Sequence, residues 1–409
     1  MAAITATRGV YRFNTDTTRV RDVADDMVKL MPDDRANALL FILTVSAKRK
    51  EGSTDTKKEW FEDDEVTFWG TISTASTTGQ TDVSVADVTI FAAGDLVLVP
   101  IVNSASTAEE VMLVTAIAGS TAGTITVTRD WSGTSSADTL AAGAALRIIG
   151  SACTEDQDTP TQRYLAQTAK ATYMQIFRTP VISTHTAMST KKYATDGKVN
   201  DHAYQLTKAM IRHRSEIEAA GLWSKAYESL GTGSSARWSS MGLKSIISTN
   251  KTSASTTLTL TGFNTFCESI FKYGSSDEKL LVSAPKIISA INYWSQSKLI
   301  THVSDTLFGV KVLRWTSAFG DFILKNHYRL EDGVTSKYGM GDEAYAIDLP
   351  SSTLYYLDGG VRKIGDTKLF EDVQQDGTTT QVDEYRSQVG WGFRHEKRHG
   401  MLYNCSAYS

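Results

Sequence analysis

Residues 195–231, TDGKVNDHAYQLTKAMIRHRSEIEAAGLWSKAYESLG, decide how the rest of this chain is interpreted. Their apolar side chains recur every three or four residues, which is the period of an amphipathic helix. The recurring positions are Val199, Ala203, Leu206, Met210, Ile217, Ala220, Trp223 and Leu230, with His213 in the one gap of the stripe. Asp196 can cap the start and Gly231 suits the end. The pattern predicts a single helix of roughly 50 Å, with His213 as a hydrogen-bonded packing residue.

The composition is that of a globular chain long enough for two or three hydrophobic cores. Of 409 residues, 41% are hydrophobic and 22% are charged, and the formal net charge is -4. This balance excludes a strongly basic nucleic-acid binder, so any contact with nucleic acid would be local. We expect no signal peptide in MAAITATRGVYRF and no membrane-spanning segment. The scattered Cys153, Cys267 and Cys405 are expected to be reduced thiols.

Residues 72–150 differ in composition from their surroundings and predict an inserted all-β domain. From residue 71 to 150 the sequence is rich in Thr, Ser, Ala, Gly and Val and contains no lysine. Two arginines against seven acidic residues give this window a net charge of -5. Short apolar runs recur at the spacing of a small antiparallel barrel or sandwich. They are DLVLVPIV (95–102), EEVMLVTAI (109–117), GTITVTRDW (123–131) and AALRIIG (144–150).

The segments on either side of this domain both read as strands, which predicts an extended loop over 46–71 and 151–190. EVTFWG (65–70) precedes the insertion and ATYMQIFRTPVISTHT (171–186) follows it, and we expect them to pair as a β-ribbon. Since an exposed ribbon needs neighbours, we predict contacts with other subunits. The predicted contact residues are Trp60, Phe61, Glu62, Asp63, Asp64, Glu65, Phe68, Trp69, Gln175, Phe177 and Arg178. The four consecutive carboxylates would alternate between strand faces, which favours ion pairs over a metal site.

Beyond the long helix the sequence alternates helix and strand, as in an α+β domain. Phe263, Phe266, Ile270 and Phe271 lie at helical spacing. KLLVS (279–283) reads as a buried strand, and Pro285 opens another helix, where its missing amide costs nothing. Strand patterns dominate again toward the end of the chain, including a long run over 382–403.

One motif near the end points to an enzyme. His395, Glu396 and His399 match H-E-x-x-H, in which two histidines bind zinc and the glutamate acts as a base. The motif requires a helix, whereas apolar side chains alternate around it as in a strand, at Val389, Trp391, Phe393, Met401 and Tyr403. On a strand the two histidines would lie about 13 Å apart, too far to share a metal. We therefore expect no enzyme and no metal or cofactor, and keep a zinc metallopeptidase as the alternative from a different class.

The order of these elements resembles the major capsid proteins of tailed bacteriophages. The segments that carry the resemblance are QIFRTPV (175–181), EIEAAGL (216–222) and TVTRDWSGT (126–134). The similarity is to the Hong Kong 97-type (Johnson) fold, in the branch with a β-barrel insertion in its extended loop. It implies an α+β fold with an N-terminal arm (1–45), an axial domain (241–360) and a peripheral domain (191–240 with 361–409).

The resemblance also implies a structural function. Such a subunit would self-assemble into pentamers and hexamers of an icosahedral head and contact the enclosed double-stranded DNA non-specifically. It would meet portal, scaffold or decoration proteins, and it would bind no membrane. It would belong to the virion capsid and assemble in the host cytoplasm. An encapsulin-like nanocompartment shell shares the fold and is the alternative within this class.

Overall fold

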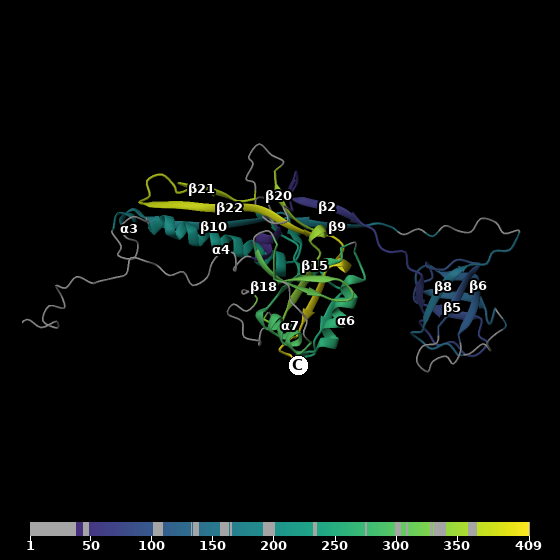
Figure 1. Ribbon diagram of the computed structural model, residues 1–409. Helices are drawn as coiled ribbons and strands as arrows, with labels where there is room; N and C mark the ends of the chain where they lie inside the picture. The colour runs from purple at the N-terminus through teal and green to yellow at the C-terminus, as the bar shows by residue number, and fades with distance from the viewer. Residues whose placement is uncertain are drawn as a thin grey trace, which may run out of the picture. The chain divides into compact units, whose positions relative to one another are not determined.

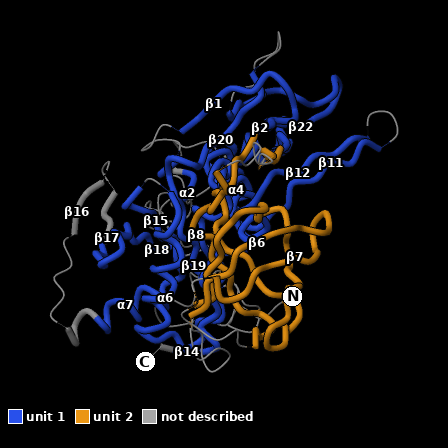
Figure 2. Tube along the Cα trace, turned by 90° about the vertical axis from the view of Figure 1, so that its right-hand side faces the viewer, with its two compact units in different colours: residues 1–60, 170–409 blue, residues 61–169 orange. Residues whose placement is uncertain are grey.

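The structure is a computed structural model that describes residues 38–43, 49–100, 109–131, 133, 139–155, 163, 166–190, 201–231, 235–274, 276–298, 304–307, 310–327, 330, 341–358 and 366–408. The chain divides into two compact units, Met1–Trp60 with Lys170–Ser409, and Phe61–Ala169 (Figure 2). Most of the predicted N-terminal arm lies outside the described residues, as does the predicted start of the long helix before Asp201. None of the described helices is long and apolar enough to cross a membrane.

A long helix, α4 (Asp201–Trp223), lies along two paired strands of the first unit (Figure 1). The strands are β10 (Gln175–Thr184) and β22 (Thr380–Phe393), and they pair antiparallel over the whole length of β10. On β10, Phe177 is buried while Ile176 is exposed, because successive side chains of a strand point to opposite faces. The buried face is therefore the one that packs beneath α4.

Two buried histidines connect α4 to both strands. The contacts are His202 Nδ1 to Ser183 Oγ and His202 Nε2 to Asp383 Oδ2, both 2.7 Å, then His213 Nδ1 to Thr179 Oγ1 at 2.9 Å and His213 Nε2 to Ser387 Oγ at 2.7 Å. These contacts confirm the packing role predicted for His213. Burial lowers the pKa of His213, because an imidazolium is poorly solvated in the protein interior. The helix is thus fixed to β10 and β22 at two points about three turns apart.

The long helix ends at Trp223, so the prediction that it continues to Gly231 is wrong. Two short paired strands follow it instead, β11 (Tyr227–Ser229) and β12 (Arg237–Ser239). The chain returns close to the helix end at Gly242, where a Cβ would lie 2.5 Å from the Ser224 nitrogen. Strand pairing overrides the helical periodicity after Trp223, and the described helix spans about 35 Å.

Strands β10 and β22 belong to a five-stranded sheet with the order β1-β20-β22-β10, in which β21 also pairs with β22. Its other members are β1 (Lys50–Ser53), β20 (Ser352–Leu357) and β21 (Lys368–Phe370). Smaller elements of the unit are α2 (Ala38–Phe41), α3 (His185–Ser189), α5 (Leu243–Ile246), the 3-10 helices η7 (Leu349–Ser351) and η8 (Glu396–Arg398), and the pair β14 (Thr257–Leu258) and β24 (Ala407–Tyr408).

A seven-stranded mixed sheet completes the first unit, in the order β13-β23-β19-β15-β18-β17-β16. The strands are β13 (Lys251–Ser253), β15 (Glu278–Ser283), β16 (Ser304–Leu307), β17 (Val310–Thr316), β18 (Asp321–Asn326), β19 (Ala344–Ile347) and β23 (Gly400–Tyr403). Helices α6 (Leu260–Phe271) and α7 (Pro285–Lys298) share a core with Leu281. The neighbouring Leu280 joins the core that contains α4. The sheet is therefore covered on both faces, as the apolar run 279–283 predicted.

The second unit is a six-stranded barrel built around its own core. Its strands are β3 (Trp69–Thr71), β4 (Asp82–Val85), β5 (Asp95–Val99), β6 (Glu110–Gly119), β7 (Gly123–Thr128) and β8 (Ala145–Ser151), in the order β3-β8-β5-β6-β7-β4. The Ser73 and Ala86 amides donate to the Ser84 and Thr71 carbonyls, which closes β4 onto the segment after β3. The α+β class and the inserted all-β domain predicted from the sequence are confirmed.

The β-ribbon exists within the predicted ranges 46–71 and 151–190, but its strands are shifted along the chain from the predicted ones. Strand β2 (Lys57–Glu62) pairs with β9 (Thr168–Tyr173) in a two-stranded sheet. The predicted partners 65–70 and 171–186 do not pair, because β10 takes β22 as its neighbour and Trp69 begins the barrel. A strand pattern shows that a segment is extended but not which strand it pairs with. Here β10 pairs over its whole length with β22, which the sequence pattern alone does not identify.

Candidate assembly surface

The predicted contact residues fall on four parts of the fold. Trp60, Phe61 and Glu62 end β2, Asp63, Asp64, Glu65 and Phe68 follow in an exposed segment without helix or strand, Trp69 begins β3, and Gln175, Phe177 and Arg178 lie on β10. The structure does not bring these groups together by strand pairing. Trp60 is 9% exposed and belongs to the core of the first unit, whereas the next side chain, Phe61, is 73% exposed. Strand β2 therefore holds the Trp60 ring inward and leaves the Phe61 ring exposed.

On β10, the three predicted residues are held by their own chain. The Gln175 side chain accepts a hydrogen bond from the Ser240 amide at 3.1 Å, and Phe177 packs edge-on against His213. Arg178 donates twice to Glu384 of β22. These hydrogen bonds, opposed by burial, lower the pKa of Glu384 to about 2. Arg178 is still 59% exposed, so it presents a fixed positive charge on the outer face of the paired strands.

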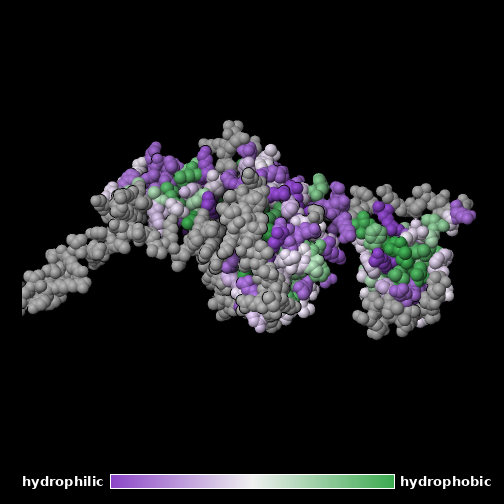
Figure 3. All heavy atoms as spheres, in the orientation of Figure 1, coloured by the Kyte–Doolittle hydropathy of each residue, from purple (hydrophilic) through white to green (hydrophobic). Residues whose placement is uncertain are grey.

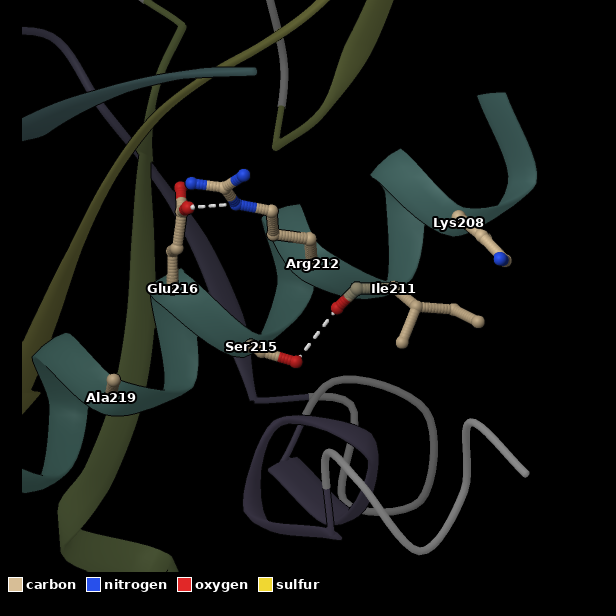
Figure 4. Close-up of a pocket in the computed structure, with 6 residues that line it drawn as sticks. All are labelled: Lys208, Ile211, Arg212, Ser215, Glu216 and Ala219. Carbon is tan, nitrogen blue, oxygen red and sulfur yellow. Dashed lines mark hydrogen bonds and ion pairs between the residues drawn. The ribbon is translucent and has the colours of Figure 1, made fainter. Parts of the chain in front are cut away.

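A shallow groove runs beside β10, between that strand and α4. It has a volume of about 400 Å³ and is lined by Thr179, Pro180, Val181 and Ile182 of β10 and by Gln205, Lys208, Ala209 and Arg212 of α4. A second hollow of about 420 Å³ shares Lys208 and Arg212 and continues along the helix past Glu216 (Figure 4). Figure 4 shows Arg212 turned toward Glu216, with an N–O distance of 3.0 Å, while Lys208 points away from this pair. Two cations one helical turn apart thus line the groove.

The strand that borders the groove has an unused edge. Among the strands that the structure describes, β10 pairs with β22 alone. Pro180 sits in the middle of β10, and a proline, which has no N–H to donate, is tolerated within a sheet chiefly on an edge strand. The groove therefore offers backbone acceptors and donors along one side and the basic side chains of α4 along the other. Sequence reasoning missed Lys208 and Arg212, although their spacing of four residues places both on one helix face.

The H-E-x-x-H motif does not form a metalloprotease helix. Glu396–Arg398 is a single 3-10 turn between β22 and β23. The prediction of a continuous strand through the motif is therefore wrong. The Glu396 carboxylate accepts hydrogen bonds from the amides and hydroxyls of Ser248 and Thr249. Its role in this structure is to join the turn to the segment after α5. Among the described residues, no group of three His, Cys, Asp or Glu side chains is placed to hold a metal ion.

His399 of the same motif is a buried residue whose titration should affect stability. Burial, and then the positive charge of Lys279, lower its pKa to about 3. A histidine in the unfolded chain takes up a proton near pH 6.5, while folded His399 does not. We therefore expect the free energy of unfolding to fall as the pH drops from about 6.5, by at most about 1.4 kcal/mol per pH unit from this residue.

Thermal unfolding of the wild type and of His399→Gln at pH 7.0, 6.0 and 5.0 measures this effect. The variant is expected to be less stable at pH 7.0 but to lose less stability on acidification. The interval above pH 5 separates this loss from that of Glu384, whose pKa is lowered from 4.5 and which therefore acts at lower pH. Parallel pH profiles for the two proteins would show that His399 does not titrate differently in the folded state.

The chain was compared with known proteins. The family model for the SU10 major capsid protein matches residues 5–406. Similar solved structures include the capsid of a native GTA particle (8% identity, 98% of this chain and 100% of that chain, TM-score 0.48) and Mycobacterium phage Bobi (7%, 97% and 98%, TM-score 0.47). The holo-SrpI encapsulin complex of Synechococcus elongatus PCC 7942 is similar over 60% of this chain and 80% of that chain (11%, TM-score 0.41). The search of curated proteins gives no match. A family match that extends over almost the whole length shows that this chain belongs to the SU10 major capsid protein family.

Proposed function

We propose that copies of this chain assemble into pentamers and hexamers that close an icosahedral phage head around double-stranded DNA. Membership of a major capsid protein family, over residues 5–406, carries this proposal. The protein would act without catalysis, and it would reside in the virion after assembly in the host cytoplasm. Its further partners would be the portal, scaffold or decoration proteins, and packaged DNA through non-specific contacts. The family match supports a viral head over a nanocompartment shell.

The proposal includes a specific contact between neighbouring copies. Residues 62–65, which read Glu-Asp-Asp-Glu, run from the last residue of β2 into the segment after it on one copy, and we place them in the groove between β10 and α4 of the next copy. Asp63, Asp64 and Glu65 are exposed and in no strand, so this segment can adopt the extended form that an edge strand accepts. Lys208 and Arg212 supply charges of the opposite sign, and Arg212 is 76% exposed.

Charge reversal in the groove tests this contact. Lys208→Glu with Arg212→Glu should leave a folded chain that forms no shells, because like charges would then face each other across the contact. The matched control reverses two exposed cations away from the groove, Arg237→Glu with Lys251→Glu, which changes the net charge equally. Electron microscopy counts the shells, and circular dichroism checks the fold. Shells from the groove variant at the level of the control would refute the contact.

A further inference from the structure

The inserted barrel has an outer face that is unusually apolar for a surface. Strands β5 and β6 place Val97 and Met112 in the barrel core, yet their outward positions are apolar too. The apolar side chains at outward positions of β5, β6 and the adjacent β8 include Leu96, Leu98, Val111, Leu113 and Ile149. Leu96 lies opposite Leu113 and Leu98 opposite Val111, so they form one continuous patch. Figure 3 shows hydrophobic side chains gathered over these strands.

This pattern is the one that strands show when both of their faces are covered. In an antiparallel sheet with one solvent-exposed face, apolar and polar residues alternate along each strand. A near-continuous apolar run instead indicates that both faces of the strand are buried. The barrel core covers the inner face of β5 and β6. On the outer face, Ile149 is 55% exposed and the other four side chains of the patch are partly exposed. The apolar outward positions therefore indicate that a partner covers the outer face of β5, β6 and β8.

No acidic side chain lies at an outward position within β5, β6 or β8, although the exposed Glu109 directly precedes β6. Arg147 is the one charged side chain at the outward positions of β5, β6 and β8, all of which are described, and it lies over the Trp69 ring at 4.9 Å. Asp95 and Glu110 are buried, with Arg163 and Arg129 as their partners. Exposed Asp82 lies on β4, which is opposite β5 in the closed barrel.

We infer that the outer face of β8, β5 and β6 binds the same face of a second copy's barrel. Two apolar patches of identical shape can meet about a two-fold axis, and Arg147 already has Trp69 as its partner, so the contact needs no acidic group from outside. Because Asp95 and Glu110 are buried in ion pairs and Asp82 lies on the opposite strand β4, the two faces can meet although each window carries -5. Five side chains are few beside the roughly 20–30 residues that each partner contributes to a standard interface. The contact should therefore be weak between free chains and stronger where assembly holds the barrels close together.

Cysteine cross-linking in the full-length chain tests the inference. The exposed Cys153 is first replaced by serine, while Cys267 and Cys405 are buried and can remain. Leu98→Cys then places a thiol at the centre of the patch, and Ala86→Cys places one beside β4 as the matched control. On mild oxidation of assembled particles, Leu98→Cys should give covalent dimers at least tenfold more abundantly than Ala86→Cys. Equal yields, or a cross-link from Leu98→Cys to a different protein or within one chain, would overturn the inference.

A second variant tests the contact without a cross-link, because a thiol at residue 98 could lie too far from its counterpart to form a disulfide. Leu98→Glu should lower the temperature at which particles come apart, since it buries a carboxylate between two copies, while the circular dichroism of the unassembled chain stays unchanged. A wild-type dissociation temperature, together with no Leu98→Cys dimer, would refute the contact. If the chain forms no shells at all, the proposed function fails, but the same cross-link can still be scored in concentrated chain.

Discussion

Replacing Glu62, Asp63, Asp64 and Glu65 together by lysine is expected to abolish shell formation while leaving the chain folded. In the proposed contact these side chains meet Lys208 and Arg212 of the next copy, so the change turns attraction into repulsion at every copy of the contact. Each exposed ion pair is worth only about 0.2–1 kcal/mol. A closed shell repeats the contact many times, however, so a small loss per contact prevents closure. Negative-stain microscopy and light scattering measure the outcome.

The informative control combines the two reversals. A chain with lysines at residues 62–65 and with Lys208→Glu and Arg212→Glu has complementary charges again, with their signs exchanged. Shells should reappear in this combined variant, although neither reversal alone forms them. If the combined variant assembles no better than the single reversals, residues 62–65 bind elsewhere, and the placement of the segment in the groove is wrong.

Trp391→Ala is expected to destabilise the first unit by about 3–5 kcal/mol, the usual cost of removing a buried aromatic side chain. Trp391 is fully buried on β22, stacks on Phe393, and donates from Nε1 to the Ile217 carbonyl at 2.8 Å. Gly221 of α4 permits this approach, because a Cβ there would lie 2.5 Å from the indole ring. The substitution thus leaves a cavity between the long helix and its strand and removes a donor from a buried carbonyl.

Urea unfolding of the non-assembling Lys208→Glu, Arg212→Glu chain provides the measurement. The inserted barrel has its own core, so its transition should not move and serves as an internal reference. Trp391→Phe keeps an aromatic ring beside Phe393 but loses the hydrogen bond, and should cost about 1–2 kcal/mol. An alanine variant as stable as the phenylalanine variant would mean that the surrounding side chains collapse into the cavity.

The sequence is most informative where a single element carries its own pattern. The helical stripe of α4, the buried strand β15, the helix opened by Pro285 and the all-β insertion follow from local periodicity and composition, and the structure has all of them. His213 could be assigned a packing role because it lies within the apolar stripe. These features depend on which side of an element is buried, which side-chain spacing reports directly.

Features that depend on distant partners could not be predicted in the same way. The strand pattern of 171–186 did not reveal that β10 pairs with β22, some 200 residues later. The end of α4 at Trp223 depends on the return of the chain at Gly242, which no local pattern shows. For the assembly surface, the sequence indicated the exposed acidic segment but not the groove. That groove forms where α4 lies beside the edge of β10 with which no described strand pairs.

Electron microscopy of the purified full-length chain, combined with its mass by light scattering, tests the central claim most directly. The claim is that this member of the SU10 major capsid protein family assembles with itself. It predicts five- and six-membered rings, tubes or closed shells, with masses that are multiples of 44.7 kDa. A chain that remains a 44.7 kDa monomer at every concentration, also with a crowding agent or with the scaffold of its own head, would contradict it.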